Sequence, residues 1–205
     1  MTPALSRLVI ASSNAGKLRE LAQMLPPGLE LIPQSKLGIP DAAEDGNTFV
    51  ANATAKALNA SRYSNLPAMA DDSGLEVDAL GGAPGVYSAR YAGEAATSAE
   101  NVSKLLDAMK DVPEAGRTAR FRCVIALLPE ADRTDPIICE GTWEGRIQNK
   151  PTGSGGFGYD PVFHVPTHNC SAAELDPAVK NRLSHRARAL QALMEVISSS
   201  HNLAL

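Results

Sequence analysis

The chain is short of cysteine and of long apolar runs, and each shortage excludes a class of protein. Its three cysteines, Cys123, Cys139 and Cys170, are too few and too scattered for a disulfide framework or a zinc motif. This usage indicates a reducing compartment, so we expect a cytoplasmic protein. No apolar run reaches the length of a membrane span, and the one near the N-terminus is too short for a signal peptide. We therefore expect no membrane association.

The chain also lacks an excess of positive charge. Its 19 Lys and Arg residues against 23 Asp and Glu residues give a net charge of −4, which argues against a general nucleic-acid binder. A small anionic ligand is not excluded, because the local field decides its binding. The 44% hydrophobic content predicts a globular chain. With no linker visible, we expect one domain over residues 1–205.

The N-terminal pattern of strand, polar turn and helix lacks two features of a P-loop. A buried strand is predicted at residues 8–11 and a helix at residues 16–25, with the turn Ser12–Lys17 leading into the helix. The first glycine of a P-loop would fall at Ala11, and Leu18 stands where the metal-binding Ser or Thr would be. The helix start can still attract an anion, and an ordinary turn is the alternative.

The remaining pattern alternates helices and strands early and places neighbouring strands later. This order predicts an α/β fold with a mixed sheet flanked by helices. We expect Ser98 to be the N-cap of the helix that follows it. The further predicted strands are residues 29–33, 68–70, 75–80, 118–128, 136–147 and 162–165, and the further predicted helices are residues 48–63, 98–110 and 184–197.

The strongest local signal is Asp71-Asp72-Ser73-Gly74, which we expect to form a turn at the end of a strand. Adjacent residues on a strand point to opposite faces, so the two carboxylates should have different roles. One can face a cleft while the other braces the turn. A carboxylate here suits Mg²⁺, which proteins usually hold with one or two carboxylates plus substrate phosphates. A plain turn rich in Asp, Ser and Gly is the alternative.

Three further stretches carry groups suited to a nucleotide. Glu44 precedes a predicted helix on which Asn52 and Lys56 share a face; a solvated helix start is the alternative. The glycine-rich run at residues 151–163 contains Phe157, whose ring can face a purine; a long hairpin loop is the alternative. Lys180 and the segment at residues 184–186 supply donors for a keto oxygen or a phosphate; a capped, solvated helix start is the alternative.

Taken together, these stretches resemble the inosine/xanthosine triphosphate pyrophosphatase family. The matching segments are SSNAGK, EDGNTFVANATAKA, ADDSGLEVDALGGAPGVYSARYAG, GGFGYDPVF, AAEL and SHRARAL, which follow the order of the family and span residues 8–197. The resemblance implies an elongated mixed sheet with two lobes and a central cleft, usually in a homodimer. It also implies Mg²⁺-dependent hydrolysis of ITP, dITP or XTP to the monophosphate and pyrophosphate, which cleanses the nucleotide pool.

The resemblance implies roles for individual residues. Asp72 resembles the general base, Lys56 a lysine that assists near the phosphates, and Glu44 with Asp72 the Mg²⁺ ligands. Phe157 would stack on the base and Lys17 would reach the triphosphate. The implied substrate-binding positions are Ser12, Ser13, Asn14, Ala15, Gly16, Lys17, Ser73, Phe157, Gly158, Tyr159, Asp160, Lys180, His185 and Arg186, of which Lys180, His185 and Arg186 would read the keto side of the purine.

Two positions depart from the family pattern. Ser13 stands where glycine is usual, which matters only if its φ is positive. Ala51 stands where the family commonly has Glu, so one carboxylate is missing. An alternative function is that of a nucleotide-binding sensor that does not hydrolyse its ligand. Ala51 is the only feature of the sequence that supports it. Two rival activities are that of a P-loop kinase or NTPase, which the missing first glycine and the missing Ser or Thr disfavour, and that of a pyrophosphatase for modified pyrimidines, which a panel of nucleotides separates.

Overall fold

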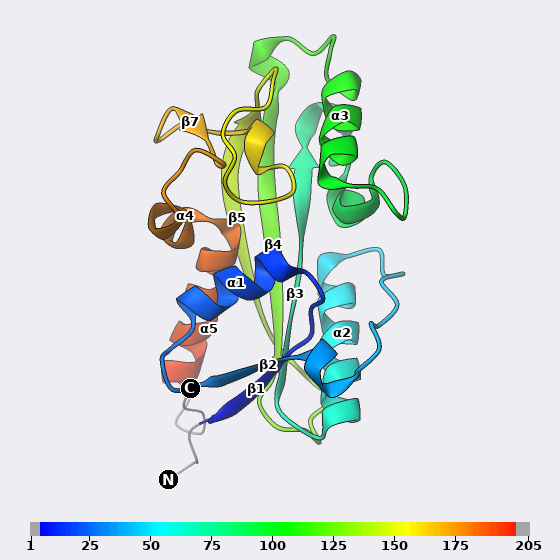
Figure 1. Cartoon of the computed structure of the whole chain (residues 1–205), viewed down its shortest axis with the longest axis vertical. Helices are drawn as coiled ribbons and strands as arrows, with labels where there is room; N and C mark the ends of the chain where they lie inside the picture. Colours follow the sequence, from blue (N-terminus) through cyan, green and yellow to red (C-terminus); the bar gives the residue numbers. More distant parts are fainter. Residues whose placement is uncertain (1–4, 200–205) are drawn as a thin grey trace. The chain divides into compact units, whose positions relative to one another are not determined.

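The computed structural model describes residues 5–199, which form a seven-stranded mixed sheet with helices, as predicted (Figure 1). The strands follow the order β2-β1-β3-β4-β5-β6-β7. The strands are β1 (Arg7–Ile10), β2 (Glu30–Pro33), β3 (Ala68–Val77), β4 (Thr118–Leu128), β5 (Ile137–Ile147), β6 (Phe163–Val165) and β7 (Cys170–Ser171). The helices are α1 (Ala15–Met24), α2 (Phe49–Ser64), α3 (Ser98–Ala108), α4 (Pro177–Leu183) and α5 (His185–Ser199).

The chain forms two compact units, each built from separate stretches of sequence. The described part of the first unit comprises residues 5–72, 123–141 and 186–199, and the second comprises residues 73–122 and 142–185. No helix among the described residues is both long and apolar enough to cross a membrane.

The first unit contains the parallel part of the sheet. Strand β1 pairs in parallel with β2 and with β3, and Leu8, Val9 and Ile10 are almost completely buried, as expected for a strand covered on both faces. One core joins this strand to α1 and α5, with Leu21 and Leu193 among its members. The alanines of α2 that face inward are fully buried as well, since small side chains allow a helix to pack closely: Ala53, Ala57 and Ala60.

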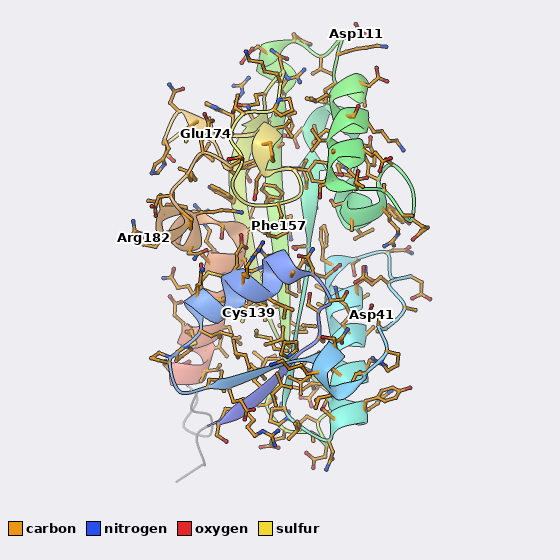
Figure 2. The ribbon with its side chains drawn as sticks, in the orientation of Figure 1. Asp41, Asp111, Cys139, Phe157, Glu174 and Arg182 are labelled. Carbon is orange, nitrogen blue, oxygen red and sulfur yellow. The ribbon has the colours of Figure 1, made fainter. Side chains whose placement is uncertain are left out.

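The second unit contains the antiparallel part of the sheet and an aromatic core. Strand β5 pairs with β6, and β6 with β7, both antiparallel. Phe121 and Trp143 pack with Phe163, at centroid distances of 4.5 and 5.2 Å, and Leu105 of α3 belongs to the same core. The glycine-rich loop between β5 and β6 carries Phe157 (Figure 2).

The structure corrects three details of the predicted elements. The expected turn at residues 71–74 is the middle of the continuous strand β3. The N-cap of α3 is Thr97 rather than Ser98, because the Thr97 hydroxyl accepts from Glu100 N while the Glu100 carboxylate accepts from Thr97 N. Helix α4 is not predicted by the sequence pattern, because its seven residues are too few for a clear period.

Arg117 is a buried arginine that ties the end of α3 to the end of β5 in the second unit. Only 3% of the residue is exposed. Its guanidinium donates to the backbone carbonyls of Met109 and Ile147, both at 2.7 Å, and of Val112 and Gln148, both at 3.3 Å. The planar fork matches these acceptors in a way that a lysine ammonium does not.

We therefore expect Arg117→Lys to lower the free energy of unfolding by about 2 kcal/mol, because buried carbonyls lose their charged donors. Urea unfolding followed by the fluorescence of Trp143, the only tryptophan, measures the change. The control is Arg133→Lys, whose ion pair with Asp135 is exposed and should matter by less than ~0.5 kcal/mol. Equal effects of the two substitutions would show that Arg117 does not brace the unit.

Candidate active site

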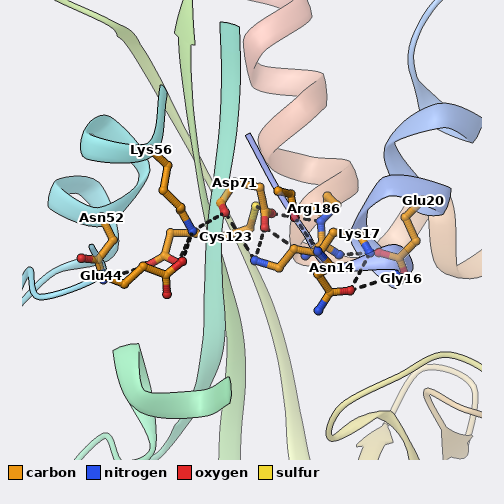
Figure 3. A network of polar contacts seen from close by, with 12 residues as sticks. Asn14, Gly16, Lys17, Glu20, Glu44, Asn52, Lys56, Asp71, Cys123 and Arg186 are labelled. Atoms are coloured by element: carbon orange, nitrogen blue, oxygen red, sulfur yellow. Dashed lines mark hydrogen bonds and ion pairs between the residues drawn. The ribbon is translucent and has the colours of Figure 1, made fainter. Parts of the chain in front are cut away.

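Asp71 and Asp72 are adjacent on β3 and contact different partners, as the alternation of strand side chains predicted. The Asp71 side chain points toward Lys17 and Arg186 (Figure 3). The Asp71 carboxylate faces α1, β4 and α5, where Lys17, Cys123 and Arg186 contact it. The Asp72 carboxylate faces α2, where Lys56 contacts it. The two neighbouring carboxylates therefore organise two separate clusters of charge in the first unit.

The Asp71 carboxylate is fully buried and compensated by two cations. Arg186 Nε donates to its Oδ2 at 3.0 Å, Lys17 Nζ forms an ion pair with its Oδ1, and the Cys123 thiol donates at 2.9 Å. Burial acts to raise the pKa of Asp71, but Arg186, Lys17 and the thiol outweigh it and hold the pKa well below its usual value. Asp71 is therefore ionised and keeps both cations in place.

The Arg186 guanidinium is shared between two carboxylates. It pairs with Asp71 and also with Glu20 of α1, and its side chain is 1% exposed. Burial acts to lower the pKa of Arg186, but Asp71, the nearby Cys123 and Glu20 raise it overall. The guanidinium thus links α5 to both α1 and β3 through protein carboxylates. Its contact with a purine, which the resemblance implies, stays a prediction.

On the other face of β3, Lys56 joins the two predicted metal ligands. Its Nζ lies 2.8 Å from Asp72 Oδ1, 2.9 Å from Glu44 Oε1 and 2.9 Å from the backbone carbonyl of Asp71. Burial raises the pKa of Asp72, and Lys56 opposes the shift without cancelling it. Burial also acts to lower the pKa of Lys56, but Asp72 and Glu44 raise it overall. Asp72 is therefore a more basic carboxylate than an exposed one.

The cations of this network are all engaged with carboxylates. Three positive groups, Lys17, Lys56 and Arg186, stand against four negative groups, the carboxylates of Glu20, Glu44, Asp71 and Asp72, which leaves these seven side chains together at −1. The two lysines also converge on one atom, because the Asp71 carbonyl accepts from both, at 2.9 and 3.4 Å. These cations alone therefore do not give the network a net positive charge.

Glu44 and Asp72 suit a divalent cation that completes its coordination with substrate and water. Their oxygens gather around one ammonium, and two carboxylates plus phosphate oxygens are a usual environment for Mg²⁺. Among residues 5–199 there is no group of three or more His, Cys, Asp or Glu side chains placed to hold a metal. The described residues thus supply a partial ligand set and no closed metal cage.

The start of α1 is capped by its own turn. The Asn14 side chain accepts from the backbone N–H groups of Gly16 and Lys17, and Ser12 Oγ accepts from Asn14 N. These donors are therefore already bonded within the Ser12–Lys17 segment. Ser13 causes no backbone strain, because the only non-glycine residues of the described chain with positive φ are Asn65 and Asn169.

In the second unit, Asp160 gathers two predicted base-binding residues. It is 2% exposed, and its carboxylate accepts from Phe157 N at 2.8 Å and from Lys180 Nζ. The Lys180 ammonium lies 5.2 Å from the centroid of the Phe157 ring. Gly156 is required beside this carboxylate, since its φ is +69° and a Cβ there would lie 2.0 Å from Asp160 Oδ2.

Two other predicted residues are buried in the same unit. Tyr159 donates from its hydroxyl to the backbone carbonyl of Ser88 at 2.9 Å, and burial raises its pKa. The His185 ring stacks on Phe121 at a centroid distance of 4.8 Å. Gly158 adopts φ +61°, and Ser73 directly follows Asp72 on β3.

Several residues of the network are not identified by sequence reasoning. The pattern predicts only a bracing role for one of the two aspartates, and it notes Asn52 only for sharing a helical face with Lys56. Glu20 and Cys123 carry no signal, because they stand in ordinary amphipathic segments. The roles of the network residues depend on partners that lie far apart in the sequence. For example, 115 positions separate Asp71 from Arg186.

Comparisons with known proteins agree with this fold and these motifs. The model of the Ham1 family matches residues 8–196. The chain is 53% identical to a dITP/XTP pyrophosphatase of Vibrio cholerae, over 94% of this chain and 97% of that one. It is 57% identical to the enzyme of the same name from Methylococcus capsulatus, over 91% and 94%.

Solved structures give the same result. A Ham1 protein from Coxiella burnetii superposes with a TM-score of 0.85 at 48% identity, covering 95% of this chain and 99% of that chain. A nucleoside-triphosphatase described as a dITP/XTP pyrophosphatase, from Mycobacterium abscessus, has a TM-score of 0.73 at 40% identity, covering 92% and 98%. The resemblance found in the sequence motifs is thereby confirmed, and the chain belongs to the Ham1 family.

Proposed function

We propose that this chain is a nucleoside-triphosphate pyrophosphatase that hydrolyses deaminated purine nucleotides such as ITP, dITP and XTP. The products are the nucleoside monophosphate and pyrophosphate, and the role is to cleanse the nucleotide pool. The observation that carries the proposal is the buried Asp72, held by Lys56 beside Glu44. The dITP/XTP pyrophosphatases of Vibrio cholerae and Methylococcus capsulatus, more than half identical to the chain, support the same reaction.

We propose Mg²⁺ as the cofactor, held by Glu44 and Asp72. When bound, the ion would offset the negative charge of the phosphate oxygens and make the attacked phosphorus more electrophilic. The charge balance favours this assignment, because a network at −1 repels a triphosphate and a divalent cation turns it to +1. Mg²⁺ also binds readily with few protein ligands and several substrate or water oxygens.

The residues of the first unit have separate tasks in this mechanism. Asp72 orients a water molecule and takes its proton as the water attacks the α phosphate, a task suited by its raised pKa. Lys56 and Lys17 face the phosphates while they remain anchored on the Asp71 carbonyl. Positioning and electrostatics, without a covalent intermediate, supply the acceleration.

We assign recognition of the base to a different group of residues. Phe157 offers a ring for stacking, and Lys180 and His185 offer donors for the 6-keto oxygen, where adenine carries an amino donor. Arg186 stays a proposed donor of the same kind. Substitution of Arg186 is a poor test of this role, because its loss would also remove a cation from the buried Asp71.

Product analysis tests the proposed reaction directly. ITP is incubated with the protein and Mg²⁺, with ATP and GTP in parallel, and monophosphate, diphosphate, pyrophosphate and phosphate are resolved. We expect monophosphate and pyrophosphate from ITP, little product from ATP or GTP, and no turnover after chelation by EDTA until Mg²⁺ is restored. Diphosphate and phosphate would place the attack on the γ phosphate and refute the mechanism. Binding without turnover would favour the sensor.

Asp72→Asn should lower kcat about 100-fold or more, because the side chain can no longer accept a proton from water. The fold should persist, since asparagine keeps the shape of the side chain and Lys56 keeps its ion pair with Glu44. Steady-state kinetics with ITP and the thermal unfolding midpoint measure the two effects. Asp45→Asn, an exposed carboxylate beside Glu44, is the matched control and should keep its turnover. Near-normal turnover in Asp72→Asn would remove Asp72 from the mechanism.

Phe157→Ala should raise KM for ITP roughly 10-fold, because stacking of a base on an aromatic ring contributes about 1–3 kcal/mol. The change in kcat should be smaller, since Phe157 is proposed to contact the base and not the reacting phosphates. Tyr87→Ala, which removes an exposed ring from the same unit, controls for aromatic loss in general. A KM that stays unchanged in Phe157→Ala would place the base elsewhere.

We also propose that the protein is a cytoplasmic homodimer. The family resemblance supports the dimer, and the three unpaired cysteines support a reducing compartment. Sedimentation equilibrium of the purified chain should give twice the mass of 21.5 kDa, and a monomer at micromolar concentration would refute the dimer. Fractionation of the source cells tests the location.

A further inference from the structure

Asn52 is a buried amide that contacts one predicted metal ligand, Asp72, and the loop that carries the other, Glu44. It is 1% exposed and stands one helical turn before Lys56 on α2. Its side-chain nitrogen donates to Asp72 Oδ2 at 3.2 Å, and its oxygen accepts from Gly46 N at 2.9 Å (Figure 3). Gly46 belongs to the loop that carries Glu44. One side chain therefore connects the Asp72 carboxylate with the segment that holds the other carboxylate.

The direction of the Asn52 amide follows from its partners. A backbone N–H can only donate, so the amide oxygen must face Gly46, which leaves the NH₂ group facing Asp72. Asp72 then receives a directional donor on Oδ2 and the Lys56 ammonium on Oδ1. Both carboxylate oxygens are thus held from the same helix.

The loop packs against this amide without spare room. A Cβ on Gly46 would lie 2.6 Å from Asn52 Oδ1 and 2.9 Å from Ala51 Cβ. The φ of Gly46 is not in the left-handed region, so the glycine is needed for close approach and not for its backbone conformation. The contact between the loop and Asn52 is therefore a steric fit as well as a hydrogen bond.

Lys56 alone cannot orient the two carboxylates. An ammonium attracts both, but it is a compact charge with three rotatable donors on a flexible stem. The planar amide of Asn52 supplies the missing direction: it stops the Asp72 carboxylate from turning and fixes Gly46 next to it. We propose that Asn52 is a positioning residue that holds Asp72 and the Glu44 loop in register for a shared divalent cation. This inference rests on the proposed function, because it assigns both carboxylates to that cation.

Three substitutions separate positioning from simple bracing. Asn52→Leu removes both hydrogen bonds at similar volume. Asn52→Asp can keep the bond from Gly46 N while it replaces the donor to Asp72 by a carboxylate. Gly46→Ala leaves every polar side chain unchanged and pushes on the Asn52 oxygen. The matched control is Asn59→Leu on the same helix, whose amide donates to the Pro40 carbonyl and lies outside the site.

Two readouts are measured for each variant: steady-state kinetics with ITP, and the affinity for Mn²⁺ alone by electron paramagnetic resonance of the free ion. Loss of an outer partner of a metal ligand typically costs roughly 10–100-fold in metal affinity or activity. We expect Asn52→Leu and Gly46→Ala to lose about 10-fold or more in Mn²⁺ affinity and in kcat, with KM within about 2-fold of the unmodified protein. Asn52→Asp should lose kcat although the loop bond persists. Asn59→Leu should change neither.

A fall in the unfolding midpoint of Asn52→Leu, with kcat and Mn²⁺ affinity of the folded fraction unchanged, would overturn the inference and leave Asn52 as a brace. If Asn52→Leu does not fold, Gly46→Ala decides by the same two readouts. If the unmodified protein forms no pyrophosphate from ITP, the proposed function fails. The Mn²⁺ titration then decides the role of Asn52 separately.

Discussion

Two adjacent carboxylates buried in one strand are the constraint on which the first unit depends. A buried charge is costly unless it is paired and hydrogen-bonded, and Asp71 and Asp72 face opposite sides of β3. Each side must therefore supply its own cation: Arg186 and Lys17 from α5 and α1 on one side, and Lys56 from α2 on the other. The same pairs that make the carboxylates tolerable also join three helices to one strand.

This compensation decides how the site can meet its substrate. Because each cation of the network already contacts a carboxylate, the protein groups alone do not favour a triphosphate. If Glu44 and Asp72 hold a divalent cation, as we propose, the ion would add two positive charges beside these carboxylates, and Lys17 and Lys56 would then act in an attractive field. Charge balance therefore supports the proposed metal, as does the chemistry of the two carboxylates.

The elements that are defined by apolar pattern could be predicted, and those that depend on distant partners could not. The buried run at residues 8–11 and the apolar stripe of α5 identified β1 and the last helix. Asp71-Asp72-Ser73-Gly74 has the composition of a turn, yet it is a strand, since Arg186 and Lys17 compensate its charge from far along the chain. The motif positions came from family resemblance. The ion pairs that hold them were visible only in the structure.

Asp160 does in the second unit what Asp71 does in the first. It is a buried carboxylate that pairs with Lys180 and fixes the backbone of Phe157, so the groups proposed for the base are also held before a ligand arrives. An ion pair within the protein weakens the attraction of its cation for a ligand. It also removes side-chain freedom that binding would otherwise have to remove, at roughly 0.5–1.5 kcal/mol per long side chain. Both units therefore favour fixed position over bare charge, which suits the discrimination between similar nucleotides that we propose.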